Sequence, residues 1–119
     1  MIEPLIARVF YTRNIAHVTH WRSQSFSQHM TLGEFYDEVI EKLDSFVESY
    51  QGRFELISGN IPAPAIVPGL DIIAQLQSDA DFIQSNRMEL SQGVDALGNL
   101  LDNLSDTYLH TIYKLKNLK

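Results

Sequence analysis

Residues 31–52 carry the pattern that most limits the fold of this chain. Apolar side chains recur there at alternating spacings of four and three residues, which places them on one face of an α-helix. Gly52 can adopt the left-handed backbone conformation that commonly ends a helix, so we expect the helix to stop there. The predicted buried face consists of Leu32, Tyr36, Val39, Leu43, Phe46 and Tyr50.

The start of this helix has two candidate N-caps. Ser25 followed by Gln28, and Thr31 followed by Glu34, both fit the capping-box pattern. If Ser25 is the cap, His29 lies in the first helical turn. If Thr31 is the cap, His29 lies in the preceding loop.

Three further segments have helical spacing. We expect a first helix over residues 4–23, with Pro4 in its first turn, and a third over residues 70–84 that ends at a break near Ser85 and Asn86. Residues 53–69 hold three prolines and two glycines and therefore form a connection. The last predicted helix carries Val94, Leu97, Leu101, Leu104, Tyr108, Ile112, Leu115 and Leu118.

These elements predict a single all-α domain over residues 1–119. Two helical hairpins joined by a long crossover give a ferritin-like four-helix bundle. The formal net charge of −6 argues against a nucleic-acid partner, because binding phosphates requires a basic surface. No apolar run approaches the ~18 residues that a membrane span needs, and Glu3 and Arg8 interrupt any signal-peptide pattern. We therefore expect a soluble, cytoplasmic protein without a membrane partner.

Residues 17–29 hold three of the four histidines and the only tryptophan. Histidine is the commonest metal ligand, so the cluster suggests a metal site. If the chain turns near Ser23, His17 and His29 each lie six residues from the turn. Their side chains are then expected at the same height on adjacent antiparallel helices.

Two carboxylates further along the second helix are the candidate partners of these histidines. Asp44 and Glu48 lie on the same side of that helix as His29, but Asp44 is fifteen residues away, or ~22 Å along a helix. One chain alone therefore cannot place all of them on one ion. An antiparallel pairing of two chains about a two-fold axis would bring the His17 and His29 of one copy to the Asp44 and Glu48 of the other.

The spacing of these four residues resembles the ferroxidase ligands of the Dps-type mini-ferritins. That motif runs from a histidine to a second histidine twelve residues later, followed by Asp-x-x-x-Glu, and His17, His29, Asp44 and Glu48 match it without a gap. The resemblance implies the ferritin-like fold, with metal ligands from both sides of a dimer interface.

Two departures from the family pattern leave alternative ligands open. Gly33 stands where the family usually has another aspartate, so Glu34 or Asp37 could substitute as a ligand. The family's tryptophan directly follows its first histidine ligand, which makes His20, followed by Trp21, the alternative to His17. The phrases AHVTHW, FYDEV, YQGR and YKLK also resemble uncharacterised ferritin-like proteins encoded by tailed phages, which would place the protein in the host cytoplasm.

The resemblance implies a protein that binds Fe(II) between subunits, oxidises it with peroxide or oxygen and stores it as mineral. Such a protein would be a ferroxidase-type oxidoreductase, with iron, or else zinc or another divalent metal, at the site. We expect no catalytic residue beyond the metal ligands, and a homo-oligomer that is a dimer through the second helix or a dodecamer. The alternative is a metal-free protein with the ferritin fold that acts in protein interactions or as a phage accessory factor.

Overall fold

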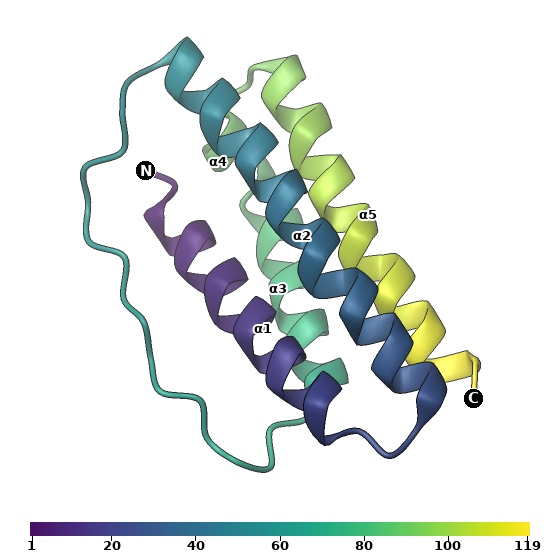
Figure 1. Ribbon diagram of the computed structural model, residues 1–119. Helices are drawn as coiled ribbons and strands as arrows, with labels where there is room; N and C mark the ends of the chain where they lie inside the picture. Colours follow the sequence, from purple (N-terminus) through teal and green to yellow (C-terminus); the bar gives the residue numbers. More distant parts are fainter.

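The computed structural model describes residues 1–119 and contains only helices, which confirms the all-α prediction (Figure 1). None of these helices combines the length and apolar character required to cross a bilayer. Four helices are long and one has only five residues. Their bounds are α1 Glu3–Arg22, α2 Phe26–Arg53, α3 Ile72–Ser85, α4 Arg87–Ser91 and α5 Asp95–Asn117.

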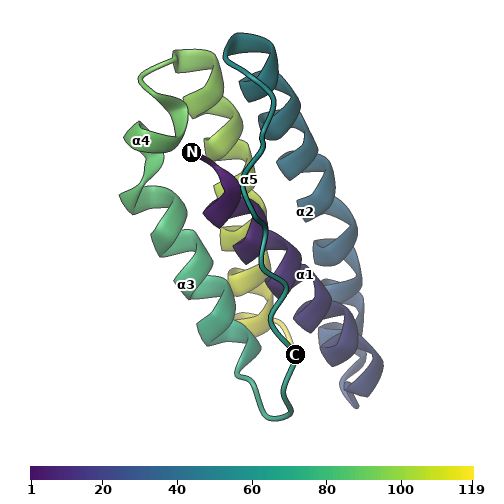
Figure 2. The same ribbon diagram turned by 90° about the vertical axis from the view of Figure 1, so that its left-hand side faces the viewer.

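The four long helices form a ring in which each packs against two neighbours. Helices α1 and α2 are an antiparallel hairpin, and α5 runs antiparallel to α3 after the short helix α4 (Figures 1 and 2). Helix α1 contacts α2 and α3, and α5 contacts the same two helices. Residues 54–71 cross from one end of the bundle to the other along the outer side of α1 (Figure 2).

Side-chain caps set the helix starts on which the site depends. The Ser25 hydroxyl accepts a hydrogen bond from the Gln28 amide at 3.2 Å, so Ser25 is the N-cap of α2 and Thr31 lies inside the helix. The carboxylate of Asp71 accepts from the amides of Ile73 and Ala74, and α3 therefore begins at Ile72 rather than Leu70.

The predicted stop at Gly52 is wrong. Helix α2 continues through Gly52 to Arg53, and the Phe54 amide still donates to the Tyr50 carbonyl at 2.8 Å. A glycine permits a left-handed turn but does not impose one, and here the helix ends at the extended connection. Left-handed φ angles occur instead at Gly69, ahead of α3, with a φ of 81°, and between α4 and α5, where Gln92 and Gly93 have φ angles of 51° and 76°.

The predicted apolar stripes make up most of the core. On α2, every predicted residue except Tyr36 is fully buried, and Tyr36 is half-buried beside α1. On the last helix Leu118 is exposed, because it lies beyond the end of α5. Burying each large aliphatic or aromatic side chain contributes ~1.5 to 3 kcal/mol. The core residues of α5 are Leu97, Leu101, Leu104, Tyr108 and Ile112.

Candidate functional site

His20 and His29 form a stacked pair where α1 and α2 meet near their turn. The two ring centroids are 3.7 Å apart, with an angle of 15° between the ring planes. The Nδ1 atom of His20 lies 2.6 Å from the His29 carbonyl oxygen, and the Nδ1 atom of His29 lies 2.9 Å from the His20 carbonyl oxygen. Since a carbonyl oxygen can only accept, each Nδ1 carries the hydrogen. In the neutral rings, each Nε2 then has a free lone pair, as in histidines whose second nitrogen binds a metal.

The prediction that His17 lies level with His29 is corrected by this register. The turn between α1 and α2 comprises only residues 23–25 and is centred on Gln24 rather than Ser23. Moving the centre along the chain brings His20 next to His29. His17 stacks instead on Tyr36, with ring centroids 3.9 Å apart, and also contacts Trp21 at 4.3 Å.

Gly33 provides the space that the His20 ring occupies. A Cβ atom at position 33 would lie 3.2 Å from Cε1 and 3.4 Å from Nδ1 of His20. The shorter separation is tighter than ordinary van der Waals contact, so a side chain there would require the imidazole to shift by a few tenths of an ångström. The aspartate that the family pattern has at this position would therefore alter the observed position of His20.

The environment of His17 favours a neutral ring. Burial lowers the pKa of His17 below its usual value, and the nearby positive charge of Arg13 and the ring of His20 lower it further. The carboxylate of Asp37 acts in the opposite direction. Tyr36 and Trp21 cover parts of this ring, so His17 packs between α1 and α2.

The predicted carboxylate ligands lie on the exposed side of α2. The side chains of Asp44 and Glu48 make no hydrogen bond or ion pair within the chain, and the two residues follow His29 by fifteen and nineteen positions on one helix. No group of three or more histidine, aspartate or glutamate side chains is close enough to hold a metal ion within one chain.

The two alternative carboxylates have different surroundings. Glu34 pairs with Lys114 of α5 at 3.1 Å, which neutralises its charge. Asp37 is exposed on α2. The remaining histidine, His110, lies 3.6 Å from Asp106 on α5, where both side chains are exposed.

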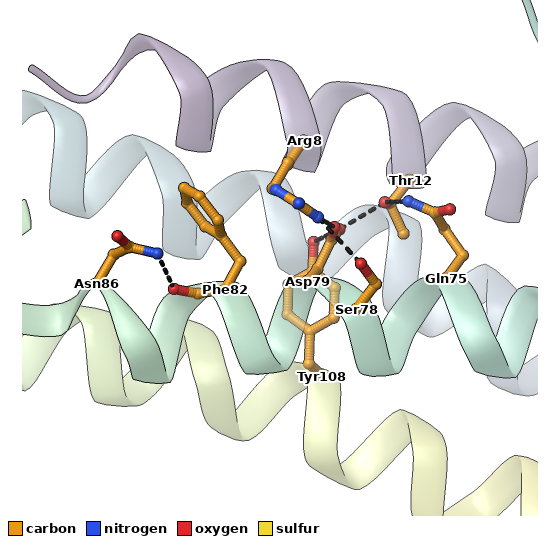
Figure 3. A network of polar contacts seen from close by, with 8 residues as sticks. All are labelled: Arg8, Thr12, Gln75, Ser78, Asp79, Phe82, Asn86 and Tyr108. Atoms are coloured by element: carbon orange, nitrogen blue, oxygen red, sulfur yellow. Dashed lines mark hydrogen bonds and ion pairs between the residues drawn. The ribbon is translucent and has the colours of Figure 1, made fainter.

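A buried polar network in the centre of the bundle was not predicted. Asp79 of α3 is only 1% exposed, and its carboxylate accepts hydrogen bonds from Thr12 and Arg8 of α1 and from Tyr108 of α5 (Figure 3). The Tyr108 hydroxyl lies 2.7 Å from Oδ2, and the Arg8 guanidinium lies 3.2 Å from Oδ1. Gln75 donates to the Thr12 hydroxyl at 3.1 Å.

Burial raises the pKa of the Asp79 carboxyl, while the hydrogen bonds from Thr12, Tyr108 and Arg8 oppose that shift. Burial is also the main cause that raises the pKa of Tyr108 well above its usual value, and the adjacent Asp79 raises it further. The network thus ties three helices together through one shared carboxylate. The sequence did hold a signal, because Asp79 interrupts the apolar stripe of α3 between Leu76 and Ile83.

Comparison with known proteins gives one match. Residues 20–115 match a family described as a family of unknown function (DUF5856). The matched region includes the histidine pair and the two exposed carboxylates of α2, whereas His17 lies outside it. No curated protein and no solved structure matches the chain.

Proposed function

We propose that this chain, which belongs to the family of unknown function DUF5856, binds Fe(II) or a similar divalent cation between two of its copies, in the manner of a Dps-type mini-ferritin. The observation that supports this proposal is the reciprocal pairing of His20 and His29. The Nδ1 atom of each ring donates a hydrogen bond to the backbone carbonyl of the other histidine, which leaves each Nε2 available as a metal ligand.

The proposed ligands are His20 or His29 of one copy with Asp44 and Glu48 of the other, because the lone pairs of two stacked rings lie in nearly parallel planes and do not meet on one ion. His20 replaces His17 because it is His20 that lies against His29. An antiparallel arrangement of two α2 helices about a two-fold axis would bring each histidine pair to the carboxylates of the second copy. Imidazole and carboxylate together suit iron and zinc.

Fe(II) is the substrate in this proposal, and dioxygen or peroxide is its oxidant. Asp44 and Glu48 are free to turn toward a second copy, since no side chain of their own chain neutralises them. Two like charges four residues apart on a helix repel each other by a few tenths of a kcal/mol, and a bound cation would remove that cost. Because Gly33 supplies no ligand, we expect weaker binding than at a site that has the additional aspartate.

The fold we propose for this function is ferritin-like. Its support is the order of the elements, with two hairpins and a crossover that runs the length of the bundle (Figures 1 and 2). The long connection contains no helix. The site itself requires only a dimer, because its proposed ligands come from two copies.

Calorimetric titration with Zn(II), and with Fe(II) under anaerobic conditions, tests the proposal. His20→Gln and His29→Gln should each lower the affinity at least tenfold, and so should Glu48→Gln. His110→Gln is the matched control, because that histidine is exposed beside Asp106 on α5. If the native chain binds neither metal, or if His29→Gln binds as tightly as the native chain, the metal-free interaction protein replaces this proposal.

A further inference from the structure

The connection between α2 and α3 contains an unusually uncharged stretch. We call residues 56–70 the crossover strap. They include no aspartate, glutamate, lysine or arginine, although the whole chain has 24 charged residues and a net charge of −6. The cores of protein interfaces are depleted of charged residues in the same way.

The strap is exposed and has few bonds to the rest of the protein. No backbone-to-backbone hydrogen bond involves it, and beyond residue 59 its one hydrogen bond is from the Tyr11 hydroxyl to the Ala65 carbonyl at 3.4 Å. Val67 is 51% exposed and Leu56 is 75% exposed. Apolar side chains and unpaired backbone groups therefore face outward on the same segment.

A groove of about 620 Å³ lies between the strap and the helical hairpin. Its apolar walls include Phe10 of α1, Ile40 of α2, and Ile61 and Ile66 of the strap. The exposed Val67 follows directly after this wall. The surface thus offers a concave apolar site beside a half-exposed apolar side chain, which is the kind of pair that a two-fold interface can make self-complementary.

The groove also lies between the two halves of the proposed metal site. Along α2, Ile40 lies between His29 and Asp44. In an antiparallel dimer, His29 of each copy would lie opposite Asp44 of the other. A two-fold axis that pairs His29 with Asp44 or Glu48 of the second copy lies level with residues 36–39, about one helical turn or less from Ile40.

We infer that the crossover strap and its groove form the apolar centre of an interface with a second copy of this chain. The choice of occupant rests on the proposed function, because the metal site there requires a two-fold mate. It also follows from charge. Two copies of a chain with a net charge of −6 repel each other least where the surface is uncharged, as it is in residues 56–70, while in the proposed metal site the carboxylates of Asp44 and Glu48 would lie opposite the histidines of the second copy.

Sedimentation equilibrium of the native chain and of two aspartate variants tests this inference. Val67→Asp places a charge in the proposed interface and should weaken dimerisation at least tenfold. Leu109→Asp is the matched control, since Leu109 is also 51% exposed but lies on α5. Circular dichroism should show the same helix content in all three proteins. The inference is overturned if the native chain is monomeric, or if Leu109→Asp rather than Val67→Asp dissociates it.

Spin labels give an independent measurement, because the chain contains no cysteine. Labels at Val67→Cys should show strong dipolar coupling between two copies, and labels at Leu109→Cys should not. Metal titration of the same samples separates the two proposals. A dimer through the strap that binds no metal would refute the function alone, whereas metal binding by a dimer that Val67→Asp leaves intact would refute the strap interface alone.

Discussion

Replacing Tyr108 with phenylalanine should destabilise the bundle by removing a single buried hydroxyl. The Tyr108 hydroxyl donates to Asp79 at 2.7 Å, and both side chains are essentially inaccessible to solvent. Phenylalanine keeps the ring and its edge-to-face contact with Phe35, so the change isolates the hydrogen bond. A hydrogen bond to a charged group contributes ~1.5 to 3 kcal/mol, and we expect ~2 kcal/mol because Thr12 and Arg8 continue to donate to the carboxylate.

Urea denaturation followed by circular dichroism measures this loss. For a domain of this size, ~2 kcal/mol corresponds to a fall in melting temperature of roughly 8 °C. Tyr113→Phe is the control, because Tyr113 lies on the same helix but is 55% exposed, and its variant should stay within ~0.5 kcal/mol of the native chain. Equal stability of the two variants would refute the view that the Asp79 network stabilises the bundle.

The pH dependence of stability provides a second measurement on the same network. Burial raises the pKa of Asp79, so the folded chain binds this proton more tightly than the unfolded chain does. The resulting stabilisation is complete below the unfolded pKa of ~3.9 and is lost as the pH rises through the folded value. The free energy of unfolding of the native chain, relative to Asp79→Asn, should therefore fall as the pH is raised from about 4 toward neutrality. A relative stability that rises over that range would contradict the assigned direction.

Three further variants test other parts of the structure. Gly33→Asp should lower the affinity for Zn(II), because its side chain displaces the His20 ring, and a higher affinity in calorimetry would show instead that an aspartate there acts as an additional ligand. Glu3→Gln should increase the rate at which a protease cleaves the crossover, because the Glu3 carboxylate accepts from the Gly59 and Ser58 amides at 2.9 and 3.4 Å. The hydrogen bond from the Gly59 amide is the main cause that lowers the pKa of Glu3. The stabilisation from this contact should therefore be present above the unfolded pKa of Glu3 and be lost as the pH falls through the lower folded pKa. A cleavage rate that is unchanged by Glu3→Gln would contradict this role. Ser25→Ala should destabilise the chain by ~1 kcal/mol in thermal unfolding by removing the N-cap of α2, while Ser49→Ala, an exposed change within the same helix, should not.

The helices were predictable because their apolar periodicity is strong and local. The stripe from Leu32 to Tyr50 and the proline-containing connection each identified one element without any knowledge of its neighbours. The sequence limited the N-cap of α2 to two candidates, because Ser25 and Thr31 both fit the capping-box pattern. Only the observed hydrogen bond from the Gln28 amide distinguishes them.

The pairing of the histidines depended on information that periodicity does not contain. A shift of the turn centre by one residue moves the position opposite His29 by two residues, from His17 to Thr19, which is next to His20. The number of residues in a turn is set by how two helices meet. The sequence identified Gly33 only as a position without a ligand side chain, and the structure adds that Gly33 makes room for the imidazole of His20.

The buried network was missed for a related reason. A single aspartate within an apolar stripe is compatible with an exposed position unless its partners are known. Its three donors come from positions 67, 71 and 29 residues away in the sequence, so no local pattern connects them.

The most direct test of the proposed metal site is anomalous X-ray scattering from crystals grown with Zn(II). We predict a peak at ~2.0 to 2.1 Å from Nε2 of His20 or His29, with a carboxylate from Asp44 or Glu48 of a second copy completing the coordination. The same crystals of His29→Gln should lack the peak. A peak found only beside Asp106 and His110, or none near the histidine pair, would contradict the proposal that this protein binds metal between two copies.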